Sequence, residues 1–298
     1  MGSIEEINGD ILAVKREIEA NKALLTAGLI SEKREIAIRG QIVADTNRLT
    51  ALEERRELRL QPQISSGAVG IDQQIPESRK RRWDGLNLVL GLNKKAKTRS
   101  DGEMSLGYSY ANWDQVKEYF PLVVGSLGTA SNGGLPEELL TALHNYLYYA
   151  TLCFGSISEG HEAKRVHFIA PIIIIVSAFF QGDIQILAEE DIDGNRVHAH
   201  GHFEFVLKRA EKRICIVEAK KDDILQGKTQ SLVGCESLCD VEHLQVSYGI
   251  ATNYLEWCFL KNEPEVITEE MLTVSLENGR PTIESLRTIA NKIIGILE

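Results

Sequence analysis

Two strand-like segments separated by a short charged turn constrain the fold of this chain most strongly. The segments are HFEFVLK (residues 202–208) and RICIVEAK (residues 213–220). Runs rich in β-branched, aromatic and other apolar residues that flank a polar turn predict a β-hairpin. With a turn of about five residues, cross-strand neighbours have closely spaced β-carbons. The facing pairs are then Leu207 with Cys215, Val206 with Ile216, and Glu204 with Glu218.

The predicted hairpin places two carboxylates and one lysine together. Alternate residues of a strand share a face, so Lys220 points the same way as Glu218, toward Glu204. Two adjacent carboxylates repel each other unless a cation lies between them, and Mg²⁺ binds oxygen ligands while keeping several waters. Carboxylates and a lysine around Mg²⁺ or Mn²⁺ suit phosphodiester hydrolysis. The residues Glu204, Glu218 and Lys220 therefore form a candidate catalytic centre.

The order of residues around this hairpin resembles a known superfamily. Glu162 falls on a predicted helix, Glu204 follows a glycine in a G-x-x-acid-aromatic strand, and Glu218-Ala219-Lys220 comes next. Two glutamines, Gln226 and Gln230, follow on a further predicted helix. This pattern resembles the PD-(D/E)XK nucleases and, more closely, the nuclease-like C-terminal domains of crinkler effectors of oomycetes and some fungi. The resemblance covers roughly Trp113 to Lys261.

The resemblance implies an α/β, restriction-endonuclease-like fold with a mixed central sheet flanked by helices. It implies that Glu204 and Glu218 bind the metal, that Glu162 supports it, and that Gln226 and Gln230 are substrate-side or supporting residues. It also implies that DNA is the substrate, often in a nucleus. Two departures stand out. The first acidic position is usually Asp but here is Glu204, whose longer arm shifts the metal, and the LFLAK-type header of secreted crinklers is absent.

A row of histidines offers a different metal site. His198, His200 and His202 alternate in front of Glu204, so all four share one strand face. Their spacing matches part of the cupin motif, and imidazoles suit Zn, Fe or Mn. The remaining spaced glycines and the second histidine strand of cupins are missing. His202 can instead border the nuclease-like centre as a supporting residue, and an ordinary structural histidine is the expectation for His198.

The chain divides into three predicted parts. Apolar residues spaced 3, 4, 3, 4 predict a helical hairpin or coiled coil over residues 1–60, which could pair with a second copy or pack on its own domain. Residues 61–112 are predicted to be a basic linker, and residues 113–298 the nuclease-like domain. The seam of the first part is formed by Ile4, Ile7, Ile11, Val14 and Ile18.

Two basic clusters lie in the predicted linker. They resemble a bipartite nuclear localisation signal, could equally bind a phosphate backbone, and could also be ordinary solvated charge. The clusters are Arg79, Lys80, Arg81, Arg82 and Lys94, Lys95, Lys97.

Composition limits the remaining functions. The net charge of −10 argues mildly against a nucleic-acid binder, although phosphate contacts need only one basic face. The five cysteines include no CxxC pair, which favours reduced thiols in an intracellular protein. No secretory signal is visible, and the apolar run Phe168–Phe180 is too short for a bilayer.

The favoured function is a Mg²⁺-dependent (or Mn²⁺-dependent) DNA endonuclease, intracellular and acting in a nucleus, without a small-molecule cofactor or membrane partner. One alternative is an inactive nuclease fold that binds DNA or a protein and oligomerises through residues 1–60. Another is a helical adaptor in which the C-terminal domain is only structural.

Overall fold

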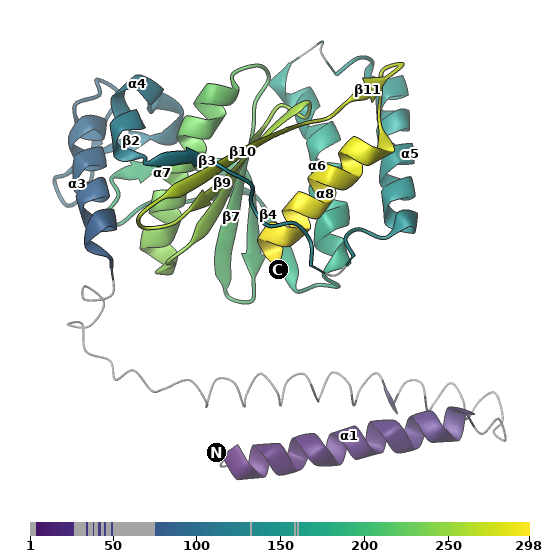
Figure 1. Cartoon of the computed structure of the whole chain (residues 1–298). Helices are drawn as coiled ribbons and strands as arrows, with labels where there is room; N and C mark the ends of the chain where they lie inside the picture. The colour runs from purple at the N-terminus through teal and green to yellow at the C-terminus, as the bar shows by residue number, and fades with distance from the viewer. Residues whose placement is uncertain are drawn as a thin grey trace. The chain divides into compact units, whose positions relative to one another are not determined.

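The computed structural model describes residues 4–26, 75–131, 133–157, 159 and 161–298, together with residues 34, 38, 41, 42, 45 and 49 (Figure 1). The chain divides into two compact units, Met1–Gly70 and Ile71–Glu298. Within the described residues, no helix is long and apolar enough to cross a membrane.

The first unit contains the helix α1 (Ile4–Thr26). Val14 and Ile18, two positions of the predicted seam, are buried, whereas Arg16 and Glu17 between them are exposed. The predicted helix is confirmed over this stretch. The second helix of the predicted hairpin falls largely outside the described residues, and self-association through residues 1–60 stays a prediction.

The second unit is built on a seven-stranded sheet. The strand pairs β7–β8 and β10–β3 are parallel and all other neighbours are antiparallel, so the sheet is mixed, as predicted. In spatial order the strands are β3 (Leu122–Val124), β10 (Ile267–Thr273), β9 (Glu256–Asn262), β8 (Ser247–Thr252), β7 (Lys212–Ala219), β6 (His202–Arg209) and β4 (Ile184–Asp191).

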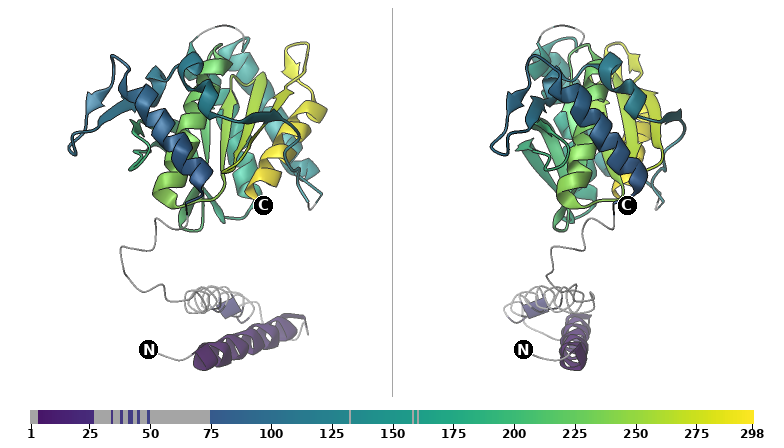
Figure 2. Two further views of the ribbon diagram at one scale, coloured as in Figure 1. Left: turned by 60° about the vertical axis from the view of Figure 1, so that its left-hand side comes forward. Right: turned by 90° about the vertical axis from the view of Figure 1, so that its left-hand side faces the viewer.

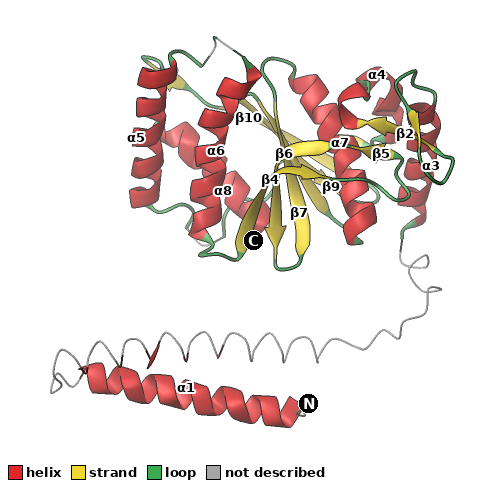
Figure 3. Cartoon of the chain, turned by 180° about the vertical axis from the view of Figure 1, so that it is seen from behind, coloured by secondary structure: helices red, strands yellow, loops and turns green. Residues whose placement is uncertain are grey.

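Helices cover both faces of this sheet (Figures 1 and 3). The apolar core on one face includes residues of α5 (Glu137–Phe154), α6 (Glu162–Phe179) and α8 (Ile283–Leu297). The core on the other face includes residues of α3 (Glu77–Gly91) and α7 (Ile224–Glu242), which lie together in Figure 2. Strand alternation explains the two layers, since Val217 belongs to the first core and Ile216 to the second.

Shorter elements complete the unit. A three-stranded sheet contains β1 (Lys97–Thr98), β2 (Met104–Gly107) and β5 (Ala199–His200), and a two-stranded sheet contains β11 (Leu276–Glu277) and β12 (Arg280–Pro281). Single turns of helix follow β2 and precede β3, and they carry the chain toward the start of α7. These turns are η1 (Tyr108–Tyr110), α4 (Trp113–Val116) and η2 (Lys117–Tyr119).

Helix α7 packs unusually closely on the sheet. Every residue from Thr229 to Asp240 is buried. A β-carbon added at Gly234 would lie 2.2 Å from the Phe203 ring, and one at Gly227 would lie 2.9 Å from Cγ of Lys220. Asp223 caps the helix by accepting the Gln226 N–H at 2.8 Å. Glycine is therefore required where α7 meets β6 and β7.

The predicted linker over residues 61–112 is wrong for residues 75–112, which belong to the second unit. Helix α3 occupies Glu77–Gly91, and its Arg79 and Arg82 are only 1% and 5% exposed. A basic run ordinarily indicates solvated chain, but here a buried carboxylate on α7 supplies the counter-charge. Residues 61–74 lie outside the described residues.

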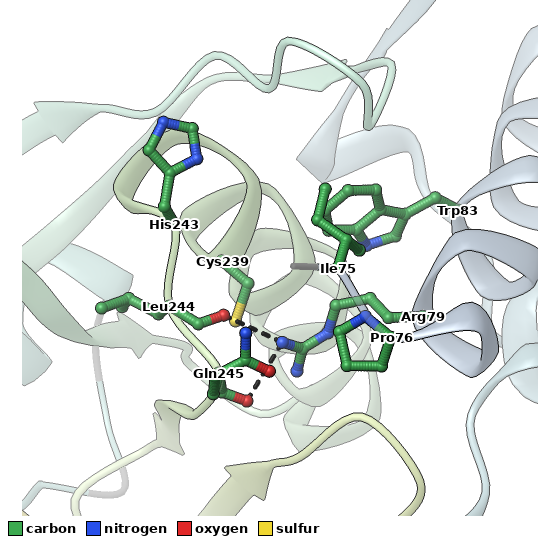
Figure 4. A pocket seen from close by; sticks show the side chains of 8 residues that line it. All are labelled: Ile75, Pro76, Arg79, Trp83, Cys239, His243, Leu244 and Gln245. Carbon is green, nitrogen blue, oxygen red and sulfur yellow. Dashed lines mark hydrogen bonds between the residues drawn. The ribbon is translucent and has the colours of Figure 1, made fainter. Parts of the chain in front are cut away.

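The buried carboxylate is that of Glu236, which is fully buried. It accepts hydrogen bonds from the Arg82 guanidinium and, at 2.7 Å, from the Trp83 indole, and it lies 3.4 Å from Nε of Arg79. Arg79 also donates to the main-chain oxygen of Leu244 at 2.9 Å, beside the pocket drawn in Figure 4. Arg79 and Arg82 therefore attach α3 to α7 and are not available to an import receptor or a phosphate backbone, contrary to the prediction.

Candidate active site

The hairpin formed by β6 and β7 has the predicted register. Leu207 faces Cys215 and Val206 faces Ile216. The turn is tighter than expected, because the register shifts by one residue after Leu207 and Arg209 then faces Lys212. The shift is a β-bulge that lets a two-residue turn, with Ala210 at φ 50°, close the hairpin.

Glu204 and Glu218 lie beyond the last paired residues of this hairpin, Phe205 and Val217. The Glu204 carboxylate accepts the main-chain N–H of Ala219 at 3.1 Å. This contact holds Glu204 against the carboxyl end of β7. The predicted neighbourhood of the two carboxylates is therefore present, and the Glu204 carboxylate contributes to the raised pKa of Glu218.

Lys220 forms an ion pair with Glu218, with Nζ 2.5 Å from Oε1. The side chains of both residues are largely buried, at 15% and 4% exposure. The other carboxylate oxygen of Glu218, Oε2, is buried without any hydrogen-bond partner. One lysine therefore satisfies only half of this carboxylate.

The charges of the site follow from its burial. Burial, followed by the neighbouring Glu204 carboxylate, raises the pKa of Glu218 to about 8 despite the opposing effect of Lys220. Burial alone would lower the pKa of Lys220, but the charge and hydrogen bond of Glu218, together with the charges of Glu162 and Glu204, outweigh burial and raise that pKa. Lys220 is therefore a cation at neutral pH, and Glu218 exchanges between a protonated form and the form that is ion-paired with Lys220.

The residues fit a divalent cation at Glu204 and Glu218. The unpartnered Oε2 and the raised pKa of Glu218 show that burial beside Glu204 disfavours the charged carboxylate, and a cation would stabilise that charged form. Within the described part of the chain, no three His, Cys, Asp or Glu side chains are grouped so as to hold a metal. The expected third carboxylate, Glu162, accepts the main-chain N–H of Lys221 at 3.3 Å. Glu162 also lies near enough to Lys220 for its charge to raise the pKa of that lysine, and its role as a third metal-supporting carboxylate stays a prediction.

The two predicted glutamines differ in what they contact. Gln226 donates from its side chain to the main-chain oxygens of Ser109 at 3.1 Å and Ala111 at 3.2 Å, so it attaches the η1 segment to α7. Gln230 is buried, and its Oε1 has no partner. Gln226 supports the scaffold, whereas Gln230 keeps a buried polar atom available.

The histidine row does not assemble a metal site. The Nδ1 of His200 lies 2.8 Å from the Ser105 hydroxyl, His202 is exposed at the start of β6, and His198 is half-buried. No metal-binding group that includes them is found among the described residues. His202 pairs with Asp191 of β4 on the strand that carries Glu204, and a contact between His202 and the candidate centre stays a prediction.

The remaining basic residues are on the surface. Lys94, Lys95 and Lys97 are exposed, and the Lys95 ammonium lies 5.9 Å from the ring centre of Tyr110. Because the carbonyls of Ser109 and Ala111 are held by Gln226, Tyr110 lies beside the start of α7. Arg81 is exposed and lies 3.5 Å from Glu77, and Lys80 is half-buried.

One further residue near the centre could not be predicted from the sequence. Arg165, one helical turn after Glu162 in α6, is 3% exposed and lies 3.8 Å from Asp222, two residues after Lys220. Nothing in the spacing of Arg165 distinguishes it from any other helical arginine.

Comparison with known proteins supports part of the sequence interpretation. The chain is 40% identical over 220 residues to "Crinkler effector protein 5" of Phytophthora infestans. This chain is a relative of a crinkler effector. The match covers 74% of the chain and 62% of that relative, so the chain spans less than two thirds of the relative's length.

The crinkler part of the resemblance predicted from the sequence is thus confirmed, and the nuclease domain stays a prediction. No protein-family model matches the chain, and no solved structure matches it. The mixed α/β sheet flanked by helices is observed, and its restriction-endonuclease-like character stays a prediction.

Proposed function

We propose that this crinkler relative is a metal-dependent nuclease that hydrolyses phosphodiester bonds in DNA, on a restriction-endonuclease-like sheet. One observation carries the proposal. Glu218 is buried beside Glu204 and Lys220 at the carboxyl end of β7, with one carboxylate oxygen unpartnered and its pKa raised to about 8. Perturbed carboxylates of this kind are expected at functional sites.

In this proposal Glu204 and Glu218 hold Mg²⁺ or Mn²⁺, and Glu162 supports the site from α6. A bound divalent cation supplies positive charge that polarises the phosphoryl oxygen and favours loss of a proton from water. Lys220 acts through its charge. Because its pKa is raised, it stays protonated and can stabilise the negative charge that develops on the phosphate.

The proteins named as effectors act on other cells, so we infer a site of action inside a host cell, with the nucleus as the expected compartment. Lys94, Lys95 and Lys97 remain exposed for import or for phosphate contacts. Lys95 and Tyr110 favour phosphate contacts, because Gln226 holds the Tyr110 segment against the helix that covers the centre.

A second candidate is an inactive nuclease fold that binds DNA or a protein and self-associates through residues 1–60. Two observations favour it. Glu204 stands where the related pattern has Asp, and no group of three metal-binding side chains is found in the described ranges. In this candidate the carboxylate pair no longer catalyses a reaction, and the protein binds DNA or its protein partner without a metal.

Plasmid cleavage by the full chain in Mg²⁺ or Mn²⁺ separates the two candidates. The variants are Glu218→Ala and Lys220→Ala, with exposed Glu277→Ala and Lys212→Ala as matched controls and EDTA as the metal-free condition. The proposal expects cutting that EDTA and both site variants abolish and that the controls retain. Cutting that survives Glu218→Ala refutes the centre, and a folded wild type that never cuts favours the second candidate.

A further inference from the structure

Arg165 is a buried cation whose hydrogen-bonding capacity is mostly unused. Its side chain is 4% exposed, and neither Nε nor Nη1 has a hydrogen-bond partner. The nearest anion is the Asp222 carboxylate, which lies 3.8 Å from Nη2 of Arg165. The Asp222 side chain is itself 73% exposed. Burying a charge without compensating hydrogen bonds is costly, so an arginine in this state is unusual unless it serves a ligand.

The other buried arginines of this unit show the contrast. Arg79 and Arg82 are as deeply buried, but both lie against the carboxylate of Glu236 and donate to main-chain oxygens. Nε of Arg79 also lacks a hydrogen-bond partner, but it lies 3.4 Å from the Glu236 carboxylate, so the fold surrounds these two guanidinium groups with a carboxylate and carbonyl oxygens. At Arg165 it does not.

Arg165 lies next to the candidate centre. It follows Glu162 by one turn of α6, and the Glu162 carboxylate accepts the N–H of Lys221, the residue after Lys220. The start of α6 thus packs on the chain that leaves β7 directly after the centre. Arg165 also lies in the second turn of an 18-residue helix, where the aligned peptide dipoles add positive potential. A guanidinium, a helix N-terminus and Lys220 therefore converge on one edge of the sheet.

We propose that Arg165 contacts a phosphate group of the nucleic-acid substrate, and that Asp222 occupies the place of this phosphate when no substrate is bound. The inference rests on the proposed function, because it takes the substrate to be a nucleic acid. Phosphate oxygens accept strong, charge-assisted hydrogen bonds from guanidinium groups. Residues 221–223 are exposed, so a strand that approaches this edge meets Asp222 first and can displace it.

The test is binding of a fluorescently labelled DNA duplex to the full chain in EDTA, over a series of salt concentrations. Arg165→Gln is expected to weaken binding by about tenfold or more, since a hydrogen bond to a charged group contributes roughly 1.5–3 kcal/mol. It should also reduce the slope of log affinity against log salt by about 0.9, the loss of one phosphate contact. Arg165→Lys should keep the slope and lose part of the affinity. The matched control is Arg287→Gln on α8, which pairs with Glu137 and should change neither quantity.

A double-mutant cycle tests the role of Asp222. Asp222→Asn should strengthen binding several-fold, because it removes a carboxylate that competes with phosphate. In the Arg165→Gln background this gain should disappear. Glu211→Gln, in the exposed turn of the hairpin, controls for the general effect of removing one negative charge.

The outcomes separate this inference from the proposed function. If Arg165→Gln lowers the melting temperature but leaves the salt slope unchanged, Arg165 is a structural residue only. If the effects of the two substitutions on DNA binding are additive, Asp222 does not compete with phosphate for Arg165. Either result overturns the inference. A wild type that binds with this slope but never cuts in Mg²⁺ refutes cleavage and leaves the arginine contact standing. A wild type that binds no DNA at low salt overturns both.

Discussion

The ammonium of Lys220 lies 2.5 Å from Oε1 of Glu218, yet Oε2 of the same carboxylate has no partner. The attraction of Lys220 is thus too weak to offset the cost of burying a charged Glu218 beside Glu204. The pKa of Glu218 therefore rises to about 8 from an ordinary value of 4.5. A group in this state opposes folding once it is charged. The centre is therefore built at the expense of stability, as expected where a fold is arranged for a ligand.

Replacement of Glu218 by glutamine should stabilise the metal-free protein relative to wild type, and by more as pH rises. Between pH 4.5 and about 8 the folded state holds a proton that the unfolded chain has lost, so the stability of the wild type falls as pH increases. The stability difference between Glu218→Gln and wild type should grow by roughly 3 kcal/mol from pH 4.5 to pH 7, as an upper order of magnitude. Chemical unfolding in EDTA at several pH values measures it, with Glu277→Gln as the control. Parallel pH profiles for Glu218→Gln and wild type would contradict the assignment.

Cation binding should release a proton. Glu218 is protonated at neutral pH without a cation, and it must lose that proton to become a ligand. Apparent Mg²⁺ affinity should therefore rise up to about tenfold per pH unit below the pKa of Glu218 and level off above it. Calorimetric titrations in two buffers of different ionisation enthalpy count the protons released. The Glu218→Gln variant should release none, and a wild type that binds Mg²⁺ equally at pH 6 and pH 8 would remove Glu218 from the ligand set.

The hairpin and its facing residues could be predicted from the sequence, because alternation in a two-sided sheet allows one register only. Leu207 with Cys215 and Val206 with Ile216 followed directly from it. The buried arginines could not be predicted. Glu236, the partner of Arg82, is 154 positions away in the sequence, and no local pattern links a basic run to a carboxylate on a distant helix. Arg165 could not be predicted for the same reason, since its lack of hydrogen-bond partners depends on how α6 packs in the folded protein.

Gly227 tests how closely the centre depends on α7. A β-carbon at this position would lie 2.9 Å from Cγ of Lys220 and 3.3 Å from Cβ of Ala251. Gly227→Ala should therefore displace Lys220 from Glu218 and lower the rate of cleavage, although alanine favours a helix by about 1 kcal/mol over glycine. Cleavage rate and melting temperature are measured together, with Gly128→Ala as the control because open space surrounds a β-carbon there. Full activity in Gly227→Ala would show that the position of Lys220 does not matter to the reaction.

Glu236 should be among the most sensitive positions of the fold although it lies outside the proposed centre. Its carboxylate is the common partner of Arg79, Arg82 and the Trp83 indole, and it is fully buried. Glu236→Gln leaves two buried guanidinium groups without a counter-charge, and loss of one partner of a buried ion pair costs about 3–5 kcal/mol. Urea unfolding measures this loss. Arg81→Gln, on the exposed side of the same helix α3, should cost about 1 kcal/mol or less. A Glu236→Gln variant as stable as Arg81→Gln would show that the basic residues of α3 do not hold it to α7 through charge.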